Sequence, residues 1–230
     1  NTIVFYSTDN GVHYNTWPDA GITPFRSEKN SNWEGAYRVP AVARWPGKIK
    51  PGQVSNEVMS HLDWMPTLVA AAGDSNLKQD LLKGRRVGSK NSKLHLDGYN
   101  FLPYLTGKAE KGPRREFIYH NDGGMPVCVR VGDWKTVFAE NRARTMALWA
   151  EPFVTLRLPK IFHLRRDPFE RADHNSNTYW DWMIDKAAQF YLGSAVTAQY
   201  LQTFKAYPPS QRPDSWSIDK LTEQYLSGAQ

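Results

Sequence analysis

The sequence predicts an α/β fold that is followed by a smaller antiparallel sheet with helices. The chain opens with Thr2-Ile3-Val4-Phe5-Tyr6, an apolar run rich in β-branched and aromatic residues, which is typical of a buried strand. Strand, loop and helix patterns alternate up to residue 112, whereas short strands joined by tight turns follow from residue 113. We therefore expect residues 1–112 to belong to an α/β domain and residues 113–230 to form a subdomain of antiparallel strands and helices.

Composition and charge indicate a globular protein and do not favour nucleic-acid binding. With 230 residues and nine tryptophans, the chain can bury a hydrophobic core. The net charge of +6 is moderate, and the densest basic tract, residues 83–93, contains no aromatic side chain that could stack on a base. We expect this tract to lie in a solvated loop. No apolar run approaches the roughly 20 residues of a membrane span.

The first part is predicted to contain two strands, a long loop and one helix. Prolines and a glycine oppose regular structure over residues 13–25, and Val39–Trp45 reads as the second strand. The helix is predicted from Asp63, which suits an N-cap, to Gly73, which suits a C-terminal stop. Two more segments complete this part, a basic loop over residues 76–93 and a short apolar segment over residues 99–105.

The second part is predicted to contain four strands and a helical tail. The strands cover residues 116–120, 127–131, 134–138 and 161–164. Asp122-Gly123-Gly124 suits a hairpin turn between the first two strands. The tail is predicted to be helical from Tyr179 to about Ala206, with an interruption near Gly193, and a last helix is expected after Ser217.

Two oxygen-bearing side chains follow the first predicted strand, in Asp9-Asn10-Gly11. Ligands of α/β folds bind outside the carboxyl ends of the strands. A carboxylate and an amide oxygen are donors that a hard divalent cation prefers. The same tripeptide also forms ordinary turns, so the pattern alone leaves both interpretations open.

Further motifs follow this tripeptide in a characteristic order. They are Lys29, Trp33-Glu34-Gly35, Arg38-Val39-Pro40 and Trp45-Pro46-Gly47. Their order and spacing resemble the sulfatase family, and most of all the bacterial arylsulfatase branch of the alkaline-phosphatase-like superfamily. The resemblance continues through residues 63–68, 96–100 and 164–170, so it covers nearly the whole chain.

The resemblance implies a fold and a missing partner. The chain would be part of a sulfatase/alkaline-phosphatase-like sandwich, with residues 1–112 as the C-terminal part of its catalytic α/β domain and residues 113–230 as its C-terminal subdomain. Asn1, rather than Met, stands at the edge of the first strand. We therefore expect the N-terminal portion of the same enzyme to be a partner of this chain.

The resemblance also implies roles for three residues. Asp9 and Asn10 match metal ligands of the family, which usually hold calcium and in some members magnesium. Two further acidic ligands belong to the N-terminal portion of that fold, and this chain offers no candidates for them. Lys29 matches the lysine that contacts the sulfate group, where a compact ammonium would stabilise the charge of the transition state.

His13 follows Asp9 closely on the predicted loop, so it is a candidate proton donor to the departing alcohol. An isolated loop histidine without a catalytic role is the alternative. Glu34 and Arg38 are expected to be structural, as a buried pair or a loop tether. The remaining five histidines show no metal-ligand spacing among themselves.

The nucleophile of the family is not found in this sequence. Sulfatases use a formylglycine made from a Cys or Ser in a Cys/Ser-x-Pro-x-Arg context. Cys128 is followed by Val129-Arg130-Val131-Gly132 and lies in an alternating strand pattern, so we expect a packed thiol. No serine fits the motif either, and we expect the formylglycine in the missing N-terminal portion.

The function implied by the resemblance is that of a sulfuric ester hydrolase, which converts a sulfate monoester to an alcohol or phenol plus sulfate. The isolated chain would supply part of the site and be inactive alone. A phosphatase or phosphonate monoester hydrolase of the same superfamily is an alternative, and so is a non-catalytic fragment that acts as a binding module. The single cysteine excludes an internal disulfide and leaves a periplasmic or a cytoplasmic location in a bacterium open.

Overall fold

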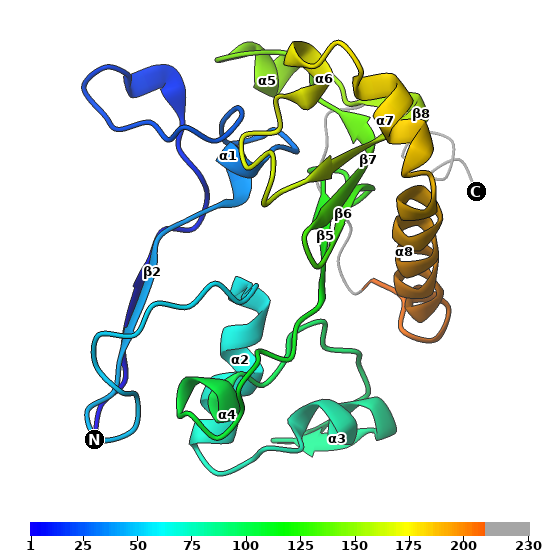
Figure 1. Ribbon diagram of the computed structural model, residues 1–230. Coiled ribbons are helices and arrows are strands. Elements are labelled where there is room, and N and C mark those ends of the chain that lie inside the picture. The colour runs from blue at the N-terminus through cyan, green and yellow to red at the C-terminus, as the bar shows by residue number, and fades with distance from the viewer. Residues whose placement is uncertain (210–230) are drawn as a thin grey trace.

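The computed structural model describes residues 1–209 and shows three groups of elements (Figure 1). A two-stranded ribbon runs along one side, a group of short helices that includes α2, α3 and α4 lies beneath, and a four-stranded sheet with the long helix α8 lies on the other side. Mixed helices with small antiparallel sheets agree with the predicted fold class. The helix expected after Ser217 lies outside the described residues.

The N-terminal ribbon pairs β1 (Val4–Ser7) with β2 (Ala41–Arg44) in antiparallel register. Both strands were predicted, but the predicted burial of the first is wrong in this chain. Tyr6 and Val42 are exposed by 68% and 61%. Aromatic and β-branched residues favour an extended backbone whether or not a layer covers the strand. No other strand of residues 1–209 pairs with the ribbon. Phe5 packs on Trp64 of α2, with 4.0 Å between the ring centres, whereas Tyr6 and Val42 stay exposed.

The helix predicted after residue 63 is confirmed. A 3-10 turn η2 (His61–Asp63) leads into α2 (Trp64–Ala71), and Gly73 ends it with a φ of +107°. Asp63 does not cap α2 with its side chain. Its carboxylate instead accepts a hydrogen bond from the Tyr99 amide at 2.7 Å and pairs with Arg114 at 2.5 Å. Asp63 therefore ties three separate segments together.

The predicted basic loop over residues 76–93 is wrong, because regular structure fills it. It contains α3 (Leu77–Lys83) and a hairpin of β3 (Arg85–Val87) and β4 (Lys90–Ser92). Leu77 and Leu81, one helical turn apart, are both buried. Two apolar side chains among many charges were too weak a signal for a helix. The apolar segment that follows forms α4 (Leu102–Leu105).

The antiparallel sheet of the second part is confirmed. It contains β5 (Glu116–His120), β6 (Pro126–Val131), β7 (Trp134–Glu140) and β8 (Val154–His163), in that order across the sheet. The predicted turn joins β5 to β6, where the Gly124 amide donates to the Asn121 carbonyl at 2.9 Å. β8 begins well before the predicted start at residue 161. An irregularity between Val137 and Ala139 lets β7 continue pairing with this earlier stretch.

The helical tail is confirmed, but its interruption is not at Gly193. The helices are α7 (Tyr179–Asp185) and α8 (Ala188–Ala206), so the break falls between them. Gly193 lies buried inside α8, where a Cβ atom would meet the Thr136 hydroxyl at 2.5 Å. The glycine therefore allows close packing of α8 on the sheet. Within residues 1–209, no helix combines the length and apolar character needed to cross a membrane.

Short elements and apolar side chains join the loops to the sheet. The short elements are η1 (Tyr14–Thr16), α1 (Glu34–Tyr37), α5 (Ala147–Ala150) and α6 (Ala172–Asn175). Trp33, next to α1, packs edge to face on Phe162 of β8. Cys128 is fully buried in the same core, and burial raises the pKa of its thiol to about 12. The predicted packed thiol is confirmed.

A buried ammonium group connects α1 to the sheet. Nζ of Lys135 on β7 lies 3.1 Å from the Glu34 carboxylate, 2.8 Å from the Glu170 carboxylate and 2.8 Å from the Asn32 carbonyl oxygen. Glu34 also pairs with Arg38 at 2.8 Å, which confirms the predicted structural pair. Burial acts to raise the pKa of Glu34, but Lys135 and its other partners outweigh burial and lower it to about 2.

We expect Lys135→Met to lower the free energy of unfolding by about 3–5 kcal/mol, because two buried carboxylates would lose the cation that balances them. Arg165→Met is the matched control, since Arg165 pairs with Asp133 at 3.0 Å on the surface. Exposed pairs contribute about 0–1 kcal/mol. Urea unfolding measures both changes, and equal losses would contradict a special role for the buried cluster.

Candidate active site

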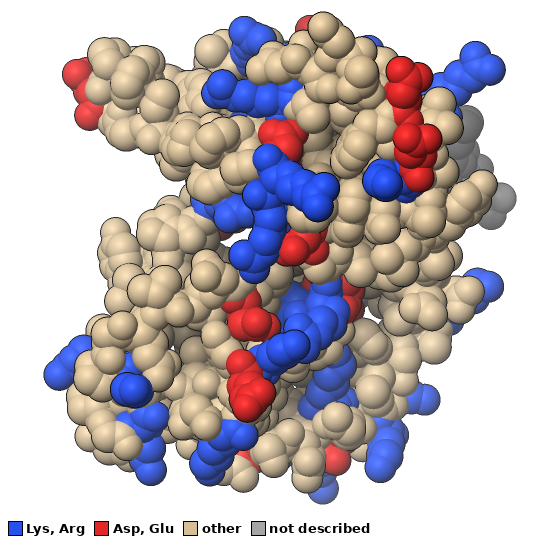
Figure 2. Space-filling view, in the orientation of Figure 1, with Lys and Arg blue, Asp and Glu red and all other residues tan. Residues whose placement is uncertain are grey.

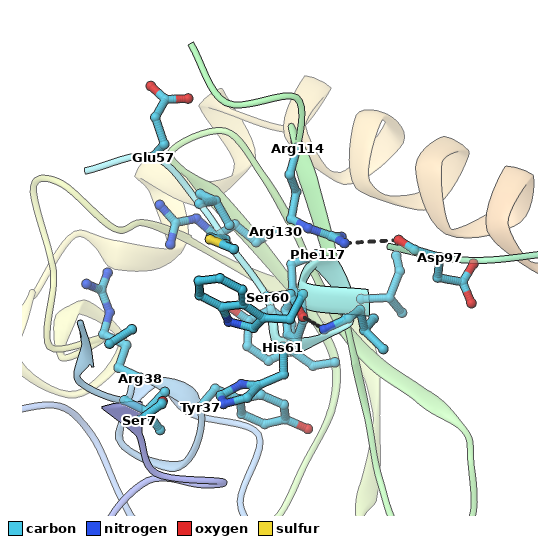
Figure 3. Close-up of a pocket in the computed structure, with 18 of the residues that line it drawn as sticks. Ser7, Tyr37, Arg38, Glu57, Ser60, His61, Asp97, Arg114, Phe117 and Arg130 are labelled. Atoms are coloured by element: carbon cyan, nitrogen blue, oxygen red, sulfur yellow. Dashed lines mark hydrogen bonds between the residues drawn. The ribbon is translucent and has the colours of Figure 1, made fainter. Parts of the chain in front are cut away.

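A cavity of about 1740 Å³ lies between the ribbon, α1, the helical group and the sheet. Asp9, Asn10 and Lys29, which the sequence assigns to one site, all line it. Figure 3 draws part of the cavity wall, with Tyr37 and Arg38 near one another at one end. The fold thus brings the predicted metal ligands and the predicted sulfate-binding lysine to one open space.

Close backbone contacts fix the loop that carries Asp9 and Asn10. The Gly11 amide donates to the Ala36 carbonyl at 2.7 Å, and the Lys29 amide donates to the Val12 carbonyl at 2.8 Å. A Cβ atom on Gly11 would lie 1.9 Å from the Gly35 carbonyl oxygen. Only glycine permits this approach. The Asp-Asn-Gly turn and the Lys29 segment are therefore held as one unit.

The side chains of Asp9 and Asn10 fit part of a metal site. The Asn10 amide nitrogen donates to the Gly11 carbonyl at 2.8 Å, which leaves its side-chain oxygen available. Asp9 is exposed and forms no ion pair with any residue of the described chain. Calcium takes roughly six to eight oxygens. No group of three or more His, Cys, Asp or Glu in residues 1–209 could hold a metal ion, so the described residues alone do not form a complete metal site.

Lys29 is half-buried on the cavity, and within the described residues no carboxylate lies within 4.0 Å of its ammonium group. The ammonium lies 5.6 Å from the centre of the Trp149 ring, within the range of a cation–π contact. Its positive charge is therefore not balanced by a carboxylate of the described residues.

The structure places His13 against Trp149, outside the lining of this cavity. The indole nitrogen of Trp149 donates to Nε2 of His13 at 3.0 Å, and Nδ1 lies 2.5 Å from the Asn15 side-chain oxygen. An indole N–H can only donate, so Nε2 carries no proton in this arrangement. Both ring nitrogens of His13 are engaged.

Sequence reasoning missed two residues beside Lys29, Glu28 and Trp149. Glu28 is buried, and its carboxylate accepts hydrogen bonds from the backbone amides of Tyr14 at 2.6 Å and Thr145 at 2.9 Å. It thus joins the His13 loop to the segment before α5. A charged residue in a loop gives no sequence signal for such burial. Trp149 lies in the apolar run Met146-Ala147-Leu148-Trp149-Ala150, which gave no sign that its ring would lie beside Lys29.

Charges of both signs are mixed over this face of the molecule. Figure 2 shows Lys and Arg interspersed with Asp and Glu down its middle, next to the hollow between the upper and lower parts. No continuous basic surface is visible on this face.

Comparison with known proteins identifies the family. The family model described as Sulfatase matches residues 1–74. Steryl-sulfatase from Mus musculus is 33% identical over 192 residues, which cover 74% of this chain and 28% of that protein. Arylsulfatase A from Bos taurus is 30% identical over 181 residues, which cover 74% of this chain and 32% of that protein. The chain belongs to the sulfatase family and spans about a third of the length of these relatives.

Solved structures agree with this assignment. PsFucS1 sulfatase from Pseudoalteromonas sp. superposes with a TM-score of 0.70 and 26% identity, over 92% of this chain and 39% of that one. The structure of Ps i-CgsB, with 20% identity and a TM-score of 0.53, supports the fold alone. The predicted sulfatase/alkaline-phosphatase-like fold is confirmed.

We expect Gly11→Ala to lower the free energy of unfolding by about 1–3 kcal/mol, because the new methyl group must displace the Gly35 carbonyl. Gly21→Ala is the control, since nothing lies within 4 Å of a Cβ atom there. Thermal unfolding of the two variants provides the comparison. An unchanged midpoint for Gly11→Ala would mean that the close contact does not fix the loop.

Proposed function

We propose that this chain forms one side of the active site of an arylsulfatase-like sulfuric ester hydrolase, of the bacterial branch that its motifs resemble. The reaction is hydrolysis of a sulfate monoester to an alcohol or phenol plus sulfate. One observation carries the proposal. Asp9, Asn10 and Lys29 line a single cavity, and backbone hydrogen bonds lock their segments together.

Each of these residues has its own role in the proposed reaction. The ammonium group of Lys29 contacts a sulfuryl oxygen and stabilises negative charge that shifts toward the leaving group. The Asp9 carboxylate and the Asn10 side-chain oxygen are ligands for calcium, or for magnesium, and a bound divalent cation would supply further positive charge at the sulfate group. Preorganisation by the Gly11 contacts keeps these groups in place before the ester binds.

His13 has a conditional role in this proposal. It can give a proton to the departing alcohol only when Nε2 carries one. In the arrangement described here, Nε2 accepts the indole N–H of Trp149. His13 therefore does not donate a proton through Nε2 while Trp149 keeps this bond.

The remainder of the site is assigned to the N-terminal portion of the same enzyme. That portion would carry the formylglycine nucleophile and the two missing acidic ligands. Two features support such a partner. The ribbon exposes Tyr6 and Val42, and two strands alone are marginally stable in water. The cavity of about 1740 Å³ also exceeds the roughly 300–1000 Å³ of a usual small-molecule site.

We expect Lys29→Ala, made in the complete gene product that contains these residues, to lower kcat for an aryl sulfate about a hundredfold. Losing a preorganised charge of this kind costs about 3 kcal/mol of transition-state stabilisation. Lys48→Ala, at an exposed lysine in the turn after β2, is the control. Unchanged turnover by Lys29→Ala would remove Lys29 from the site. Faster hydrolysis of the matched aryl phosphate would favour a phosphatase or phosphonate monoester hydrolase instead.

We expect the isolated 230-residue chain to bind calcium more weakly than the micromolar range, because only Asp9 and Asn10 of a larger oxygen set are present. The complete gene product is expected to bind more tightly and to lose that binding in Asp9→Ala. Isothermal titration calorimetry compares the proteins. Micromolar calcium binding by the isolated chain would contradict the division of ligands.

A further inference from the structure

Trp149 combines wide exposure with a fixed position. Its side chain is 55% exposed at the end of the short helix α5. A single exposed tryptophan is unremarkable in itself. Trp149 differs because its indole N–H donates to His13 and its ring lies 5.6 Å from the Lys29 ammonium. The ring is therefore held beside the proposed sulfate-binding lysine with much of its surface uncovered.

Buried polar groups anchor the segment that carries Trp149. The Asn141 side-chain amide donates to the carbonyl oxygens of Leu148, at 3.2 Å, and Glu151, at 3.3 Å. The backbone amide of Asn141 donates in turn to the Asn32 side-chain oxygen at 3.1 Å. These bonds fix the backbone before and after Trp149 and connect α5 to the loop that carries Lys29.

A second anchor comes from Glu28, whose buried carboxylate accepts the Thr145 amide at 2.9 Å. Asn32 and Glu28 stand on either side of Lys29 in the sequence. The loop of the proposed sulfate-binding residue is thus the same loop that positions Trp149. Burial of polar side chains is favourable only when their hydrogen bonds are made, so this docking is specific.

We propose that Trp149 is a specificity-determining residue that covers the leaving group of the ester with the face of its ring. The proposal rests on the proposed sulfatase function. Trp149 does not itself line the cavity that Asp9, Asn10 and Lys29 line, so the ester-linked group meets the indole where it extends past the Lys29 ammonium, which lies 5.6 Å from the ring centre. Stacked rings have centroid separations of about 4.5–7 Å. The leaving group that fits is a flat ring with an apolar face, either an aromatic ring or a sugar ring.

The hydrogen bond to His13 restrains the orientation of the indole ring. It fixes one edge of the indole, so the exposed face cannot turn away without breaking this bond. A preorganised wall stabilises a ligand without a further cost in side-chain entropy. An acyclic leaving group has no flat face to offer and gains little from it.

The test compares three substrates of the complete gene product: an aryl sulfate, a monosaccharide sulfate and an acyclic alkyl sulfate. Trp149→Ala is expected to lower kcat/KM about tenfold for the ester whose ring it covers, and less than about twofold for the alkyl sulfate. Trp149→Phe retains a ring face and is expected to stay within about threefold of the unchanged enzyme. The ester that loses most identifies the ring as aromatic or sugar.

Trp180→Ala is the matched control. Trp180 is 52% exposed, and its indole forms no hydrogen bond with any residue in the described range. Trp149→Leu keeps apolar volume without a flat face and gives the same comparison if Trp149→Ala does not fold. An equal loss for all three esters, or no loss for any, would overturn the proposal.

Binding of a non-hydrolysable aryl sulfonate, measured by calorimetry, separates this proposal from the proposed function. Suppose that the complete gene product hydrolyses no sulfate ester but binds the sulfonate tightly, and that Trp149→Ala weakens this binding about tenfold. That result would support the ring contact of Trp149 and reject the proposed hydrolase function. If Trp149→Ala hydrolyses every ester with the kcat/KM of the unchanged enzyme, the hydrolase function is supported and the ring contact is rejected.

Discussion

The position of Lys29 depends on a buried ammonium group elsewhere in the chain. Lys135 lies on β7 and contacts Asn32 in the loop after Lys29, Glu34 at the start of α1 and Glu170 beyond β8. A buried cation remains stable only while its partners surround it. Three segments that are remote in sequence must therefore meet at one point. The proposed site lies on one of them.

This arrangement makes the two predicted parts of the chain interdependent. The boundary near residue 112 stays a prediction, yet strong contacts cross it. Arg114 pairs with Asp63 at 2.5 Å, and the Tyr119 hydroxyl donates to Glu34 at 2.7 Å. Through Tyr119 and Lys135, the antiparallel sheet contacts Glu34 in the segment that follows Lys29.

Local signals allowed much of this to be predicted. Periodicity and turn residues located the helix that ends at Gly73 and the strands of the sheet. The roles of Asp9, Asn10 and Lys29 stay predictions, and the structure shows that all three line one cavity. Properties that depend on remote neighbours were missed. The break assigned to Gly193 is a packing contact with β7, and the exposure of Tyr6 depends on what lies over the ribbon. Trp149 was missed because its neighbours come together only through folding.

The segment between β7 and β8 has a consequence for how such enzymes can diverge. It leaves the sheet after Glu140, carries Trp149 and returns at Val154, and it is held mainly by hydrogen bonds to backbone groups. A hydrogen bond to a backbone atom can persist when the side chain of that residue is replaced. Under the proposed function, a substitution at position 149 changes the preferred ester while the strands and the Lys29 loop stay unchanged, so substrate choice can evolve separately from the hydrolysis of the sulfate ester.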